Sequence, residues 1–203
     1  MKKIALLLAL ASLTTLTQAQ DTFVETPDHR LPVAQEWQSV HGSIRVAWGS
    51  SDVRYAWHSL PDVQRLHRHE QLTAWRGERV SALALIYGDV ATDSVAPLTL
   101  QLSSFKSGRH TLPTQAVQAA FVRYVKTDAW STPAGRGAGC GYRPDHTLYD
   151  SAMVADIIDP HAESIHMEAM STRSVWVSCQ VPADAAKGTY SGTLSIKAGK
   201  RTI

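Results

Sequence analysis

Two stretches near the C-terminal end of the chain alternate between hydrophobic and polar residues. Over residues 175–181 the apolar side chains hold one phase and Trp176 belongs to the other, and residues 190–197 alternate in the same way. A period of two places successive side chains on opposite faces of a β-strand. Pro182 ends the first stretch, because proline has no N–H to donate to a β-ladder. The pattern predicts a β-hairpin over residues 173–196, with Trp176 turned away from its buried face.

Similar patterns predict strands in the rest of the chain. Residues 79–87 are nearly continuously apolar, which is typical of a central strand buried on both faces. Residues 153–158 fit a strand or a helix, and residues 164–170 alternate weakly. The clearest remaining strands cover residues 44–48, 98–102 and 119–125. With about eight short strands and no convincing long helix, the predicted fold class is all-β, an antiparallel β-sandwich.

The N-terminal segment has the organisation of an export signal. Lys2 and Lys3 precede an apolar run over residues 4–13, and Thr17-Gln18-Ala19 offers small residues around a cleavage point. We therefore expect a signal peptide over residues 1–19, a flexible leader over 20–35 and one β-sandwich domain over 36–203. The expected location is the periplasm or the medium. Residues 201–203 resemble the start of another strand, so we also expect the chain to be a fragment of a longer protein.

The charge balance limits the classes of binding partner, and the cysteine content raises the question of a disulfide. Without Lys2 and Lys3, the chain has 18 basic residues against 18 acidic ones. This balance gives no reason to expect binding to nucleic acid or to anionic lipid. Cys140 and Cys179 could form a disulfide in an oxidising compartment, or could remain two unpaired thiols. The sequence leaves both possibilities open.

One loop carries the residues that best suit a ligand site. Residues 131–145 contain four glycines and two prolines, which indicates a long irregular segment. Long loops within compact domains are often functional. Aromatic faces bind the C–H face of a pyranose, and polar groups hold its hydroxyls. We therefore expect any substrate-binding site of this chain at Asp128, Trp130, Tyr142 and Arg143.

The other aromatic and metal-type residues have simpler explanations. Trp48, Trp75 and Trp176 are expected to pack in the core or between the sheets. A string of potential metal ligands over residues 161–168 is explained by an exposed polar face. No nucleophile motif or phosphate-binding glycine loop is present. The sequence predicts no metal, no cofactor and no catalytic residue in this chain.

Taken in order, several segments resemble the N-terminal domain of glycoside hydrolase family 123-type proteins. They are WGSSDVRY (48–55), AWRGERV (74–80), FVRYV (121–125), CGYRP (140–144), VADIID (154–159), and VWV (175–177) followed by GTYSG (188–192). The resemblance runs from about Glu36 to Ile196 and so covers most of the chain after the leader.

The resemblance implies two domains, a non-catalytic β-sandwich and a separate catalytic barrel. In that family the β-sandwich precedes a (β/α)₈ barrel that cleaves β-linked N-acetylgalactosamine by a substrate-assisted mechanism. The barrel uses an adjacent Asp-Glu pair, in which Asp orients the acetamide and Glu is the acid/base. This chain contains no Asp-Glu or Glu-Asp dipeptide. No catalytic residue is therefore carried over, and the expected partner is a C-terminal catalytic domain of the same polypeptide.

Three functions remain open at this point. The first is the non-catalytic β-sandwich of an exported glycoside hydrolase acting on N-acetylgalactosamine-type glycans, which would brace the barrel and contact glycan. The second is a free-standing carbohydrate-binding or surface-adhesion module. The third is an Ig-like spacer that binds nothing. In each case the chain alone is not expected to be an enzyme.

Overall fold

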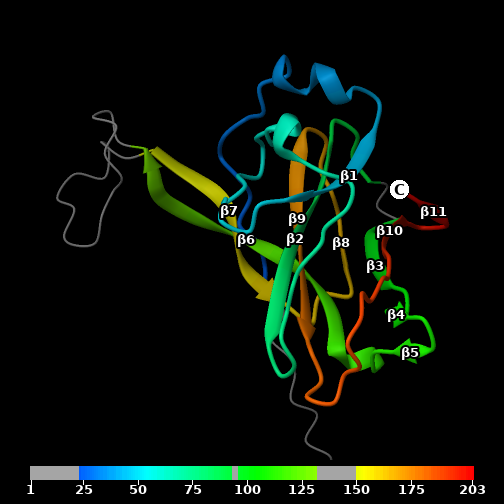
Figure 1. Ribbon diagram of the computed structural model, residues 1–203. Coiled ribbons are helices and arrows are strands. Elements are labelled where there is room, and N and C mark those ends of the chain that lie inside the picture. The colour runs from blue at the N-terminus through cyan, green and yellow to red at the C-terminus, as the bar shows by residue number, and fades with distance from the viewer. Residues whose placement is uncertain (1–22, 93–95, 132–149) are drawn as a thin grey trace, which may run out of the picture.

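The computed structural model describes residues 23–92, 96–131 and 150–203, and these residues build an all-β fold. They form eleven strands and three short 3₁₀ helices, with no α-helix in those ranges, which confirms the predicted fold class (Figure 1). No helix of this part is long and apolar enough to cross a membrane. The elements are η1 Glu36–Val40, β1 Ile44–Gly49, η2 Val63–Arg65, β2 Arg79–Gly88, β3 Leu98–Leu102, β4 Lys106–Ser107, β5 His110–Thr111, η3 Thr114–Ala116, β6 Val117–Ser131, β7 Asp150–Asp159, β8 Ser164–Ile165, β9 Ser171–Gln180, β10 Leu194–Ala198 and β11 Arg201–Thr202.

The strand count exceeds the predicted eight because several strands are only two residues long. β4 and β5 are too short to show a period of two in the sequence, β8 lies in the weakly alternating segment 164–170, and β11 lies in the strand start expected at 201–203. The longer strands β1, β2, β3 and β6 lie where the patterns predicted them. The ambiguous segment 153–158 is part of β7, whereas only the first two residues of segment 164–170 form a strand, β8.

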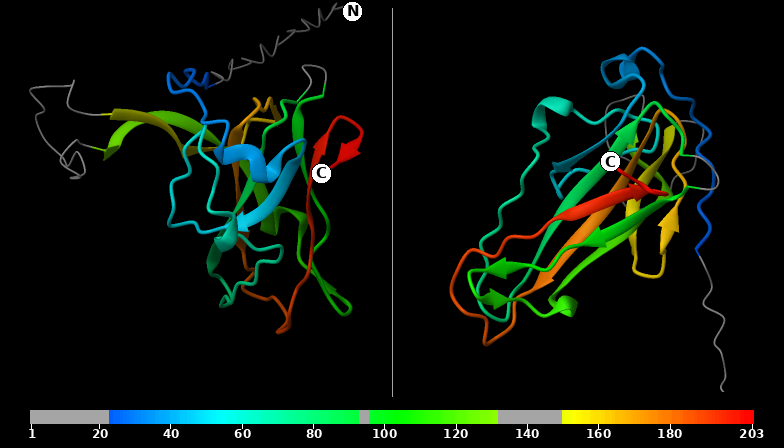
Figure 2. Two further views of the ribbon diagram at one scale, coloured as in Figure 1. Left: turned by 90° about the horizontal axis from the view of Figure 1, so that it is seen from above. Right: turned by 90° about the vertical axis from the view of Figure 1, so that its right-hand side faces the viewer.

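The strands form two main sheets that face each other in layers (Figure 2). The larger sheet has the order β1-β2-β9-β6-β7, and the smaller has the order β11-β10-β3-β8. All pairs within them are antiparallel. β4 and β5 form a separate two-stranded hairpin. β6 and β7 continue together beyond the body of the sandwich as a projecting arm (Figure 1).

The main core lies between the two sheets. Side chains from β2, β6 and β9 of the larger sheet meet side chains from β3, β8 and β10 of the smaller one. Burial of this apolar surface is the principal term that holds the two layers together. The buried members are Ala84, Ile86, Leu98, Val117, Phe121, Ile165, Met167, Val175, Val177 and Ile196.

The outer face of the larger sheet is also covered, which explains the continuous apolar run of β2. Leu83, Leu85 and Tyr87 of β2 form a second cluster with Trp37 and Val40 of η1. Partly buried side chains between residues 55 and 66 pack against the same cluster. Since the opposite phase of β2 faces the inner core, both faces of this strand are buried, as its sequence predicted.

The predicted hairpin over residues 173–196 is wrong. β9 pairs with β2 and β6 in the larger sheet, whereas β10 pairs with β3 and β11 in the smaller one. Residues 181–193 therefore carry the chain from one layer to the other. Periodicity identified both strands, but it does not encode which strand each one pairs with. The predicted phase is confirmed, because Val175 and Val177 face the inner core and Trp176 packs on the outer cluster.

Candidate functional site

A small hollow on the outer face of the larger sheet has the composition of a ligand subsite. Its volume is about 130 Å³. Three strands supply an apolar floor, namely Leu83 from β2, Val122 from β6 and Trp176 from β9. Trp176 reaches this face because it is out of phase with the two inward valines on either side of it. The remaining lining residues are Ser51, Val53, Ala155 and Asp156.

A β-bulge brings a carboxylate to the rim of the hollow. Arg123 of β6 pairs with Ile157, whereas the next residue, Tyr124, pairs with Ala155. Asp156 is thus the extra residue in β7 with no partner on β6. A bulge of this kind bends the strand and redirects a side chain. Asp156 is exposed and lines the hollow, so its carboxylate is available to a ligand.

The opposite rim is a tight turn after β1. The N–H of Val53 donates to the carbonyl of Ser50 at 3.4 Å, and the N–H of Ser50 donates to the phenol oxygen of Tyr55 at 3.1 Å. Burial raises the pKa of the Tyr55 phenol, more than the hydrogen bond from Ser50 lowers it. The phenol therefore stays neutral at physiological pH. A Cβ on Gly49 would lie 2.7 Å from that phenol oxygen, so this close packing needs glycine.

The groups that line the hollow are of the kind that bind a sugar ring. An indole, apolar side chains, one carboxylate and one hydroxyl are the groups that proteins use to hold a sugar ring. Glycoside hydrolysis uses a pair of carboxyl groups on either side of the scissile bond. The lining of the hollow contains a single carboxylate, that of Asp156.

The sequence-predicted site lies largely outside the described residues. Asp128 and Trp130 fall near the end of β6, where the backbone is described and the side chains are not. Tyr142 and Arg143 fall within residues 132–149, which are not described. The prediction that these four residues bind a ligand is therefore untested. Their loop belongs between β6 and β7, which project as the arm in Figure 1.

The disulfide prediction is untested for the same reason. Cys140 lies outside the described residues, and Cys179 has no disulfide partner among those that are described. Cys179 is half-buried in β9 and packs against the inner core, as its phase predicted. Burial raises the pKa of its thiol. Cys179 alone is therefore a weakly reactive thiol.

The expected packing of three tryptophans holds for two of them. Trp48 packs against the inner core and Trp176 against the outer cluster. Trp75 does not pack in either, since 82% of its surface is exposed. It lies just before β2, where the chain turns into the sheet. An exposed tryptophan and a buried one give the same pattern in sequence, so the exposure of Trp75 could not be predicted.

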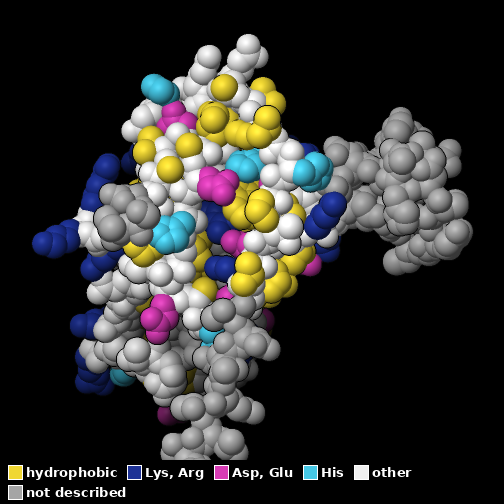
Figure 3. All heavy atoms as spheres, turned by 180° about the vertical axis from the view of Figure 1, so that it is seen from behind, with side chains coloured by type: hydrophobic (Ala, Val, Ile, Leu, Met, Phe, Trp, Pro, Cys, Tyr) yellow, Lys and Arg dark blue, Asp and Glu magenta, His cyan; other side chains and the backbone are white. Residues whose placement is uncertain are grey.

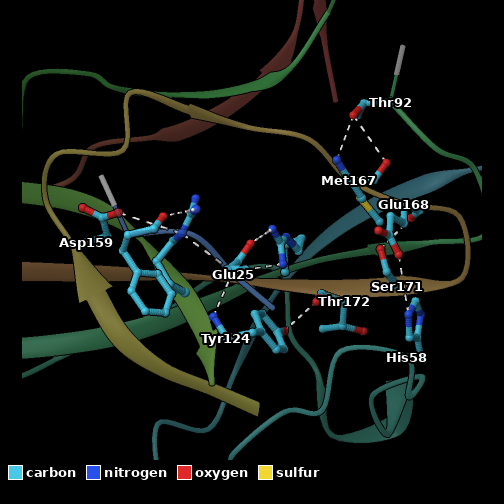
Figure 4. Close-up of polar contacts among 12 residues, drawn as sticks. Glu25, His58, Thr92, Tyr124, Asp159, Met167, Glu168, Ser171 and Thr172 are labelled. Carbon is cyan, nitrogen blue, oxygen red and sulfur yellow. Dashed lines mark hydrogen bonds and ion pairs between the residues drawn. The ribbon is translucent and has the colours of Figure 1, made fainter. Parts of the chain in front are cut away.

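A buried ion pair anchors the leader to the sandwich (Figure 4). The Glu25 carboxylate accepts hydrogen bonds from the Arg173 guanidinium at 2.6 and 3.3 Å, and from the Tyr124 N–H at 2.8 Å. The guanidinium carbon lies 4.5 Å from the centre of the Trp57 ring, a cation–π contact. Glu25 and Arg173 are both buried, at 9% and 4% side-chain exposure. The described part of the leader is irregular, as expected, but at this point it is fixed to β6 and β9.

A second polar cluster lies near this anchor. It contains Glu168, one of the residues in the string of potential metal ligands. Glu168 contacts the His58 ring at 3.5 Å, and the other ring nitrogen of His58 lies 3.1 Å from the carbonyl of Met170 (Figure 4). Met170 has a positive φ of 53°, which marks a tight turn before β9. No group of three or more His, Cys, Asp or Glu in the described part of the chain is placed to hold a metal ion.

The surface seen from behind has a mixed character (Figure 3). Hydrophobic, acidic and His side chains intermingle over its centre with a few Lys and Arg side chains, and more Lys and Arg side chains lie along the left edge. The centre of this face is therefore not a basic surface of the kind that binds phosphate backbones.

Comparison with known proteins decides the family. A sequence model of the glycoside hydrolase 123 N-terminal domain matches residues 48–198. The chain belongs to this family. Four of the segments on which the resemblance rests meet at the hollow, because residues 48–55, 121–125, 154–159 and 175–177 all contribute lining side chains. That convergence is a signal that the sequence contained, although no single segment reveals the hollow by itself.

A solved structure supports the fold assignment. The chain superimposes with a TM-score of 0.61 and 16% identity on a family 123 glycoside hydrolase from Clostridium perfringens, studied for glycolipid glycan hydrolysis. The match covers 78% of this chain and 25% of that enzyme. At this identity the likeness establishes the β-sandwich fold alone. A search of curated proteins finds no significant match.

Proposed function

We propose that this chain is the non-catalytic N-terminal domain of an exported glycoside hydrolase that acts on N-acetylgalactosamine-type glycans. The observation that carries the proposal is the match of residues 48–198 to the N-terminal domain of family 123. The related enzyme is about four times as long as the matched region, which leaves room for a catalytic barrel. The signal-like residues 1–19 support export.

A bracing role for the domain is supported by one end of the edge of the larger sheet. β7 is the last strand in that sheet, and residues 55–57 bridge its outer edge at residues 153–155. Beyond that bridge, Ile157 and Ile158 are 38% and 46% exposed on β7. The Arg123 guanidinium, from the strand next to β7, donates to the carbonyl of Phe23 at 3.1 Å, which places the exposed leader residues Phe23 and Val24 close by. Exposed apolar side chains beside a free edge favour docking of another domain. We assign this edge to the contact with the catalytic barrel.

A glycan-contacting role is supported by the hollow. The Trp176 indole can lie against the C–H face of a sugar, and the Asp156 carboxylate can accept from its hydroxyls. Because Asp156 is exposed, replacing it by Asn should leave the fold intact while weakening this contact.

The experiment compares the parent enzyme with and without residues 36–203. If this domain braces the barrel, its removal lowers the thermal midpoint of the barrel and its turnover of an aryl N-acetyl-β-galactosaminide. A barrel that is equally stable and active without the domain would contradict the bracing role. A parent polypeptide without any (β/α)₈ domain would contradict the proposal as a whole.

The second candidate is a free-standing carbohydrate-binding module. The observation that favours it is the hollow itself, which holds a tryptophan and a carboxylate without needing a second domain. Affinity electrophoresis of the purified chain through gels that contain different glycans tests this function. Retardation that Asp156→Asn reduces would support it, and equal mobility in all gels would exclude it.

A further inference from the structure

Trp75 is the exception among the described tryptophans. Its surface is 82% exposed, whereas Trp37 and Trp57 are 1% and 6% exposed. Trp48 and Trp176 pack against the inner and outer clusters. A large indole is normally at least partly buried, since its apolar area is the largest of any side chain. The exposed indole of Trp75 is therefore available to contact a ligand.

The backbone under Trp75 is held in a tight turn. The N–H of Glu78 donates to the carbonyl of Trp75 at 3.2 Å, and the Glu78 carboxylate accepts from the N–H of Trp75 at 2.7 Å. Gly77, third in the turn, has a φ of +80°, which glycine adopts without strain. Both ends of the turn are thus tied to each other, and Trp75 starts from a fixed backbone position.

The end of β9 holds this turn from the other side. The N–H of Gly77 donates to the carbonyl of Val181 at 2.9 Å, and the N–H of Val181 donates to the carbonyl of Glu78 at 2.8 Å. The side-chain amide of Gln180 donates to the carbonyl of Gly77 at 2.8 Å. The turn therefore belongs to the rigid end of the β2–β9 pair. A site built on such a support loses little conformational entropy when it binds a ligand.

The surroundings of Trp75 distinguish a sugar from a protein partner. Its neighbours in the chain, Arg76, Glu78 and Arg79, are all exposed and charged. The centre of a protein interface is depleted of charged residues, whereas a sugar needs one flat apolar face beside hydrogen-bonding groups. Arg76 makes no polar contact with the other described residues, so its guanidinium is available to donate. The nearest exposed apolar residue in sequence is Leu72, at 46% exposure.

We propose that Trp75 is a glycan-stacking platform, separate from the hollow, that takes a galacto-configured pyranose. The axial 4-hydroxyl of such a ring leaves several C–H groups together on one face, which can lie on the indole. Arg76 donates to the ring hydroxyls. The inference deepens the proposed function and rests on it for the class of ligand, because the galacto configuration is that of the N-acetylgalactosamine-type glycans proposed above. It assigns Trp75 to binding and not to the chemical step.

The test titrates the purified chain with the methyl β-glycosides of N-acetylgalactosamine, galactose and glucose. NMR follows the indole N–H signal of Trp75, which Trp75→Phe identifies by its loss. The two galacto-configured sugars should shift this signal at lower concentration than the glucoside. Trp75→Ala should weaken their binding by about 10-fold or more, whereas Trp75→Phe should retain part of it.

Leu72→Ala is the matched control, because it removes an exposed apolar side chain from the same approach to β2. It should leave binding unchanged, and all three variants should keep the thermal midpoint of the parent chain. An unmoved Trp75 signal with every sugar, or equal weakening by Leu72→Ala, would overturn the platform. Turnover of a soluble aryl substrate by the parent enzyme is measured separately. If the parent enzyme does not turn over this substrate but the sugar still binds at Trp75, the result would count against the proposed function alone.

Discussion

Replacement of Glu25 by Ala should destabilise the sandwich more than any other change in the leader. The Glu25 carboxylate is 9% exposed and accepts two hydrogen bonds from Arg173, itself 4% exposed, and one from the Tyr124 N–H. Removal of one partner of a buried pair leaves an uncompensated charge, which costs about 3–5 kcal/mol. Because water can reach the vacated position from the leader side, we expect the lower end, about 3 kcal/mol. In a domain of this size that lowers the thermal midpoint by about 10 °C.

The assay is urea unfolding of the purified chain, followed by tryptophan fluorescence. Arg65→Ala is the matched control, since the Arg65 guanidinium pairs with Asp62 at 3.2 Å across an exposed turn, with side-chain exposures of 85% and 58%. Removal of such an exposed pair should change stability by less than about 1 kcal/mol. The double variant Glu25→Ala, Arg173→Met should recover part of the loss, because no buried charge is then left unpaired. Equal midpoints for Glu25→Ala and Arg65→Ala would refute the reasoning.

Three further changes test other parts of the structure. Asp156→Asn should leave the unfolding midpoint unchanged and reduce retardation in a glycan-containing gel, whereas a loss of stability would show that the carboxylate is structural. A Cβ on Gly88 would collide with the carbonyl oxygen of Ser43 just before β1, so Gly88→Ala should lower the free energy of unfolding in urea by about 1–3 kcal/mol. Gly188→Ala meets a serine hydroxyl that can rotate away and should cost clearly less. Burial raises the pKa of the Cys179 thiol. In the variant Cys140→Ser, this thiol should therefore react with a disulfide reagent more slowly in the folded chain than in urea, and its rate in the folded chain should rise with pH. Equal rates in the folded chain and in urea would contradict the burial of Cys179.

Local pattern was sufficient for the strands and insufficient for their pairing. The apolar run of residues 79–87 predicted a strand buried on both faces, and β2 is covered by the smaller sheet and by the segment around Trp37. The same reasoning joined β9 to β10, although they lie in different sheets. Pairing depends on contacts between distant segments, and a short connecting sequence does not determine it.

The candidate sites show the same limit. The hollow is assembled from four strands and the turn after β1, and its carboxylate is placed by a register shift between β6 and β7 that no local pattern encodes. Glu25 lies in a polar leader, and its partner Arg173 is 148 residues away. The exposure of Trp75 depends on a turn held by the end of β9. Each of these features follows from long-range contacts, whereas the family could be inferred from ordered short segments.

The most direct test of the account measures hydrolysis of an aryl N-acetyl-β-galactosaminide by the purified chain and, in parallel, by its full-length parent. The account predicts release of the aryl group by the parent and none by the chain, because the roles proposed for the chain are support and glycan contact and its sequence has no adjacent Asp-Glu pair. Hydrolysis by the chain alone would contradict it.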